Sequence, residues 1–250
     1  MIGAIAGREL KSLFLSPLAW IILAAVTGIT AWIFLIQLDQ FLNLQAQLAR
    51  RESPPGATDI VVVPLFNLLG ILLLMVLPLL TMRLISEERR NGTLPLLLSS
   101  PLGAGSIVLG KFLAMLAFSA LVTASAVLMG LSLYAGTRPD LGQITSAACG
   151  LLLLASAFSA IGLYISSLTR QPGIAAVATF GVLFMLWIVH WAGQTGESGQ
   201  EILAWLSITR HQQSFQLGLL NSGDIAYYLI VTLLFLLFGI RRLEMERLQG

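Results

Sequence analysis

The stretch RLISEERRNGTLPLLLSSPLGAGSIVLGK occupies residues 83–111 and separates two long apolar runs of the chain. Its first half predicts a helix end, because Arg89 and Arg90 suit the negative end of a helix dipole and Asn91-Gly92 tolerates a positive φ. We therefore expect the helix of the preceding apolar run to continue through Glu87 and Glu88 and to end at Gly92.

The second half of the stretch predicts a short separate helix at about residues 94–99. Thr93 can cap such a helix, and Pro95 is tolerated in a first helical turn. The helix would present Leu94, Leu96, Leu97 and Leu98 and would end before Pro101. Burying each leucine is worth about 1.5–3 kcal/mol, so these side chains should be covered. The cover is either the lipid interface or a soluble partner.

The composition indicates an integral membrane protein. Of the 250 residues, 57% are hydrophobic and only 10% are charged, and the mean hydropathy is +0.88. Soluble domains carry about 25% charged residues, so this chain has too few to cover a water-facing surface. The net charge of +2 is too small to indicate nucleic acid binding, and the single cysteine, Cys149, excludes an intrachain disulfide. No cleavable signal pattern is expected at the N-terminus.

Six apolar runs predict an all-α membrane protein with one transmembrane domain over residues 1–250. The expected spans are about 18–37, 61–81, 106–134, 142–168, 173–191 and 225–240. We expect a polar loop at 38–60 and a charged tail at 241–247.

Small residues recur along the fourth span, at Ala155, Ser159, Gly162 and Ser166. This spacing predicts close helix contacts within the bundle. A substrate-lining role for the hydroxyls is the alternative.

Residues 1–16 combine an apolar helical face with charged positions, and Pro17 follows them. We expect an amphipathic helix that lies in the membrane interface. The alternative is an N-terminal extension of the first span.

The basic residues predict the orientation of the spans. Six spans put both termini on the same side as the stretch 83–111. That side would hold ten of the fourteen basic residues, namely Arg8, Lys11, Arg83, Arg89, Arg90, Lys111, Arg170, Arg241, Arg242 and Arg247. Both termini and the stretch are therefore expected in the cytoplasm.

The deep interior of the expected spans contains no Asp, Glu, Lys or Arg. Such residues mark ion pathways and proton relays, so their absence disfavours an ion-coupled transporter or an ion channel. His190 is expected at the interface, and His211 has no Cys, His or carboxylate neighbour at metal-ligand spacing. The sequence thus predicts neither a metal site nor a catalytic site.

Two fragments resemble nucleotide-binding motifs without completing them. Residues 105–111 fit the first seven positions of a phosphate-binding loop, but Phe112 stands where Ser or Thr should bind Mg²⁺. Lys111 is expected instead to extend to the interface by snorkelling. Ser198-Gly199-Gln200 resembles part of an ATPase signature but falls on the expected outer side. Any ATP should therefore be used by another chain.

The pattern Glu-Glu-Arg-x-x-Gly-Thr-Leu-x-x-Leu-Leu-x-x-Pro-Leu at 87–102, followed by Ile-Val-Leu-Gly-Lys-Phe at 107–112, resembles the permease subunits of type 2 ABC (ABC-2) transporters. The GldF-like branch, of gliding motility and copper-enzyme maturation, is the most similar. Residues 8–17 and 161–169 match it as well. Pro95 departs from the family, which often has glutamate there.

The resemblance implies dimers of permeases, in which each copy binds a separate ATPase through a coupling helix between spans 2 and 3. It assigns this role to Glu87, Glu88, Arg89, Arg90, Gly92, Thr93, Leu94, Leu96, Leu97, Leu98 and Pro101. ATP and Mg²⁺ would be bound by the ATPase and no cofactor by this chain. Further implied partners are a second or related permease and periplasmic or accessory membrane subunits. Residues 192–224 would form an outer re-entrant or short-helix region.

We therefore expect a non-catalytic permease subunit of an ATP-driven exporter in the bacterial inner membrane. The alternative is a membrane scaffold or maturation factor that anchors a complex. A membrane-embedded enzyme is disfavoured because the sequence has no acid/base cluster. Uncharged spans favour lipid-like, hydrophobic or polypeptide cargo, or mechanical signalling, without choosing among them.

Overall fold

The computed structural model describes residues 2–48, 55–98, 103–192 and 207–249. Every regular element in these ranges is helical. In chain order they are α1 (Ile2–Leu15), α2 (Pro17–Leu48), η1 (Thr58–Val62), α3 (Val63–Thr81), α4 (Ser86–Arg90), α5 (Leu94–Leu98), α6 (Ala104–Ser132), η2 (Leu133–Ala135), α7 (Leu141–Leu168), α8 (Pro172–Ala192), α10 (Ile208–Gln216) and α11 (Ser222–Gln249). Of the short elements, η1 is a π-helix and η2 a 3₁₀-helix.

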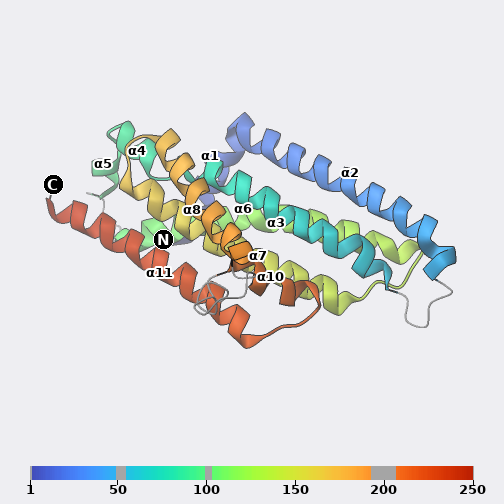
Figure 1. Ribbon diagram of the computed structural model, residues 1–250. Coiled ribbons are helices and arrows are strands. Elements are labelled where there is room, and N and C mark those ends of the chain that lie inside the picture. The colour runs from blue at the N-terminus through green and yellow to red at the C-terminus, as the bar shows by residue number, and fades with distance from the viewer. Residues whose placement is uncertain (1, 49–54, 99–102, 193–206, 250) are drawn as a thin grey trace.

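Six helices in the described ranges are long and apolar enough to cross a membrane: α2, α3, α6, α7, α8 and α11. The prediction of an all-α protein with six spans is confirmed. Figure 1 shows these helices as one elongated bundle, with α4, α5 and the C-terminus gathered at one end. The far end of α2 and the start of α3 lie at the opposite end.

Helix α7 is the centre of the bundle, because it packs against α3, α6, α8, α10 and α11. The small residues of α7 allow these helices to pack closely against it. Ala155 and Ser159 are fully buried, and a Cβ on Gly162 would collide with the Thr81 side chain of α3. A Cβ on Gly150 would lie 2.6 Å from the Phe215 side chain of α10. The interpretation of the small-residue stripe as a bundle contact is thus confirmed at Gly162.

Two helices are longer than predicted. Helix α2 continues to Leu48, so residues 38–48, which were expected to belong to the polar loop, are helical. Between 38 and 48 the chain has no Pro or Gly to end the helix, Phe41 is buried, and Asn43 donates to Asp39 one turn earlier. Helix α11 likewise runs through the expected charged tail to Gln249, because Leu243 on the tail is fully buried in the core.

The N-terminal helix α1 is separate from α2. The chain bends at Ser16, and Pro17 occupies the first position of α2. Helix α1 packs along α6, where a Cβ on Gly110 would lie 2.6 Å from the Ile5 side chain. The helix therefore does not extend the first span, and its location in the membrane interface stays a prediction.

Candidate coupling junction

We call the turn at residues 82–85, α4 and α5, together with the side chains of α1, α6 and α11 that form ion pairs around α4, the junction. It begins where α3 ends. Residues 82–85 form a turn between α3 and α4, so residues 87–90 do not continue the helix of the second span as predicted. The turn is held by Ser166 of α7, whose Oγ accepts from the backbone amides of Ile85 (3.2 Å) and Ser86 (3.1 Å) and donates to the Met82 carbonyl (3.0 Å). One hydroxyl thereby pairs with three backbone groups at the helix break, and the Met82 carbonyl also accepts from the Ser86 hydroxyl.

Helix α4 ends as predicted, at a left-handed glycine. Gly92 has φ +71°, its amide donates to the Arg89 carbonyl (3.3 Å), and the Thr93 amide donates to the Glu88 carbonyl (2.9 Å). This pair of bonds is the Schellman arrangement. The Thr93 hydroxyl also donates to the Glu88 carbonyl, at 3.2 Å. Gly92 and Thr93 thus turn the chain back on itself between α4 and α5.

Helix α5 covers most of the expected range of the short second helix. Leu94 is only 5% exposed and packs in the chain's own core, and Leu97 is partly buried against it. The burial of Leu94 leaves little of this side chain for a partner to contact. Pro101 and the side chains of Leu96 and Leu98 lie outside the described residues, so their predicted coupling role stays a prediction.

Lys111, on the second turn of α6, links two other helices. Its side chain is 1% exposed, and its Nζ lies 2.7 Å from Glu88 of α4 and 3.1 Å from Glu9 of α1. The expectation that Lys111 snorkels to the interface is therefore wrong. A buried ammonium needs carboxylate partners, and both partners are distant in sequence. The two ion pairs connect α1, α4 and α6.

A second ion pair connects α4 to the C-terminal helix. Arg89, whose side chain is 11% exposed, pairs with Glu246 of α11, which also lies 3.7 Å from Arg242. The neighbouring pair, Arg90 with Glu87, spans 3.8 Å between side chains that are 58% and 40% exposed. Exposed pairs of this kind contribute about 0–1 kcal/mol. Arg89 and Glu88 therefore hold α4 in place, whereas the Arg90–Glu87 pair contributes little to this.

A second polar cluster lies at the opposite end of the bundle. Gln143 Nε2 donates to Asp59 Oδ1 (2.8 Å) and to the Gln216 carbonyl (3.0 Å), and Gln216 Nε2 donates to Asn67 Oδ1 (2.8 Å). We call these four residues the amide cluster. It joins η1, α3, α7 and α10, and its two glutamines are less than 9% exposed.

Beside the amide cluster, His211 of α10 contacts Asp224 of α11, with 2.5 Å between Nδ1 and Oδ1. The His211 ring stacks on Tyr227 at 4.1 Å. Asp224 lies 13 residues after His211. This separation matches no metal-ligand motif, so the sequence did not indicate the contact. The described residues contain no group of three side chains that could hold a metal ion. Helix α10 is the short helix expected within 192–224, of which 193–206 lie outside the described residues.

The resemblance to a phosphate-binding loop does not extend to the structure. Residues 105–111 lie in the first two turns of α6 rather than in a loop, and the amides of Ser106 and Ile107 donate to the Gly103 carbonyl. No strand precedes α6 in the part of the chain that the structure describes, whereas a phosphate-binding loop follows a strand. The Ser198-Gly199-Gln200 fragment lies outside the described residues.

Comparison with protein families gives a match to the family described as ABC-2 family transporter protein, over residues 4–248. A search of curated proteins found no match. The family match includes every described helix from α2 to α10 and nearly all of α1 and α11. The chain is a multi-pass membrane protein with six apolar helices, and it belongs to the ABC-2 transporter family.

Proposed function

We propose that this chain is the transmembrane permease subunit of an ATP-driven exporter of the GldF-like branch. In this proposal a separate ATPase subunit binds ATP and Mg²⁺ and docks on α5, and a second or related permease completes the transporter. The chain lies in the bacterial inner membrane with both termini and α4–α5 in the cytoplasm. The ion pairs that join α4 to three other helices, directly or through Lys111, are the observation that carries the proposal.

Family membership supports the ATPase partner, because ABC-2 members typically pair with an ATPase subunit. The sequence of this chain has no complete nucleotide-binding motif. The charge distribution supports the orientation: α1, α4 and the end of α11 are joined by ion pairs at one end of the bundle. That end carries the basic residues that favour the cytoplasmic side.

The geometry provides a route for rigid-body motion. A displacement of α5 is passed through the tight Gly92 turn to α4, because five residues of α4 leave little length to absorb it. From α4 the displacement reaches α6 and α1 through Lys111, and α11 through Glu246. Ser166 keeps the start of α4 against α7. Three of the helices that contact α4, namely α6, α7 and α11, are spans, so motion at α5 would reorient the bundle.

The test is to purify the chain from its native membrane and identify what accompanies it. The proposal expects an ATPase subunit, whose recovery falls when Leu97 is changed to Asn. The control is Leu219→Asn, since Leu219 is exposed beyond α10. Recovery of the same ATPase with both variants would contradict docking on α5. A scaffold, the alternative function, would bind the ATPase without any effect of cargo on ATP hydrolysis.

A further inference from the structure

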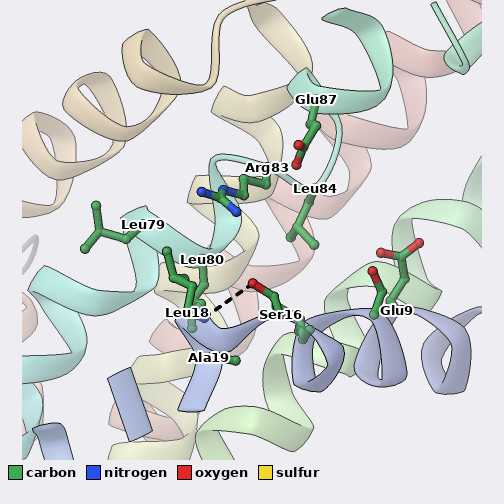
Figure 2. Close-up of a pocket in the computed structure, with 11 residues that line it drawn as sticks. Glu9, Ser16, Leu18, Ala19, Leu79, Leu80, Arg83, Leu84 and Glu87 are labelled. Carbon is green, nitrogen blue, oxygen red and sulfur yellow. Dashed lines mark hydrogen bonds between the residues drawn. The ribbon is translucent and has the colours of Figure 1, made fainter. Parts of the chain in front are cut away.

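A small pocket lies between the N-terminal helix and the end of α3. It holds about 130 Å³, room for several water molecules. Figure 2 shows its walls, which come from α1, the start of α2, the end of α3 and α4. The lining residues are Glu9, Ser12, Leu13, Ser16, Leu18, Ala19, Leu79, Leu80, Arg83, Leu84 and Glu87.

The pocket has an apolar wall and a polar wall. Leu18, Leu79 and Leu80 lie together on one side in Figure 2. Arg83 lies between these side chains and Glu87. Ser12 and Ser16 line the α1 side, and the Ser16 hydroxyl, which accepts from the Leu18 amide at 3.4 Å, still has its own hydrogen to donate. A ligand that fits both walls must be amphiphilic.

The charged side chains of the pocket differ in whether they form ion pairs with other residues. Glu9 is held by Lys111 and Arg8, each at 3.1 Å. Arg83 is exposed and makes no ion pair or side-chain hydrogen bond with the described residues. Glu87 has only the long, exposed contact with Arg90 at 3.8 Å among these residues. Within the described part of the chain, the pocket therefore offers one free guanidinium and one loosely held carboxylate.

The location matches the level of lipid headgroups. The pocket lies where α2 begins and α3 ends, the ends of two apolar helices. Next to it, Trp20 is 57% exposed, stacks edge-on against Phe14 at 5.3 Å and donates from Nε1 to the Phe14 carbonyl. Tryptophans in this arrangement are typical of membrane interfaces, and pockets with basic residues between spans bind lipid heads.

We propose that this pocket binds a phospholipid whose head carries both a phosphate and a primary ammonium group, as in phosphatidylethanolamine. Arg83 binds the phosphate, assisted by the hydroxyls of Ser12 and Ser16. Glu87 accepts from the ammonium, and the acyl chains lie along Leu79 and Leu80. A choline head has no N–H group to donate to Glu87, and a glycerol head has no cation. The site is independent of the function proposed above, because no ATPase is needed to fill it.

The test measures which lipids stay with the full chain when it is purified without an ATPase. The protein is equilibrated with vesicles of equal parts phosphatidylethanolamine, phosphatidylglycerol and phosphatidylcholine, and native mass spectrometry counts the bound lipids. We expect enrichment of phosphatidylethanolamine. Arg83→Gln should lower its retention about tenfold, the effect of losing a charge-assisted hydrogen bond. Glu87→Gln should remove the preference over the other two lipids.

Two further variants and a soluble competitor serve as controls for the site. Arg138→Gln removes an exposed arginine at the opposite end of the bundle and should leave lipid retention unchanged. Arg83→Lys keeps the cation and should retain the lipid, which shows that position 83 acts by charge rather than by folding. Free phosphoethanolamine at millimolar concentration should not displace the lipid, because it lacks acyl chains. Displacement by it, equal retention of all three lipids, or full retention by Arg83→Gln would overturn the proposal.

Discussion

The two ends of the bundle are both held by buried polar groups, but of different kinds. At the coupling junction, charged side chains from α1, α4, α6 and α11 meet in ion pairs centred on Lys111 and Arg89. At the opposite end, the amide cluster joins η1, α3, α7 and α10 mainly through uncharged side chains. Amide hydrogen bonds require close alignment, whereas attraction between charges falls off slowly with distance. We therefore expect the ion pairs of the junction to tolerate a shift of the helices better than the hydrogen bonds of the amide cluster do.

The largest effect is expected at the centre of the junction. Lys111→Met removes the cation that pairs with both Glu9 and Glu88 and leaves Glu9 only its contact with the exposed Arg8. Breaking a buried pair costs about 3–5 kcal/mol, and we expect about 3 kcal/mol because both carboxylates remain partly exposed. Thermal unfolding in detergent should show this as a lower Tm. The matched control is Lys11→Met, since Lys11 is exposed on α1. Equal unfolding of both variants would contradict the role assigned to Lys111.

The amide cluster should respond in a different way. Gln143→Leu leaves Asp59 Oδ1 and the Gln216 carbonyl without their donor, at a cost of about 1–3 kcal/mol. The expected result is a lower Tm with ATP hydrolysis by an associated ATPase still responsive to the permease. Gln40→Leu, at an exposed position of α2, is the control and should leave Tm unchanged. Loss of the response to the permease without loss of stability would break the distinction between the two ends.

A smaller, local effect is expected at the turn between α3 and α4. Ser166→Ala removes the group that pairs with Ile85, Ser86 and Met82, so the amides of Ile85 and Ser86 should exchange with solvent faster. The global cost should be about 1 kcal/mol, typical of one net hydrogen bond. Ser167→Ala is a close control, because the Ser167 hydroxyl donates to the Tyr164 carbonyl within α7. Unchanged exchange at residues 85 and 86 would show that Ser166 does not hold the turn.

Local signals in the sequence predicted part of this molecule correctly. The apolar runs predicted six helices, and Asn91-Gly92 predicted the end of α4, because both depend on residues adjacent in the chain. The full length of α2 could also have been predicted, because residues 38–48 contain no Pro or Gly to end a helix. Their polar composition, however, favoured a loop.

Contacts between distant segments could not be predicted in this way. Ser166 lies 80 residues from the turn that it holds, and Lys111 lies 102 residues from Glu9. Nothing near Lys111 in the sequence indicates that two carboxylates will surround it, so snorkelling was the simpler expectation. The His211–Asp224 contact depends in the same way on how α10 folds back against α11.

Transmission through the ion pairs of α4 is tested most directly by comparing two adjacent arginines in the reconstituted transporter. Arg89 pairs with Glu246 and is mostly buried, whereas Arg90 is exposed. We would measure ATP hydrolysis by the ATPase bound to permeases carrying Arg89→Gln or Arg90→Gln, at equal ATPase recovery. We expect Arg89→Gln to uncouple hydrolysis from the permease while Arg90→Gln behaves as the unmodified chain. Normal coupling with Arg89→Gln would contradict a role for the Arg89–Glu246 pair in transmission.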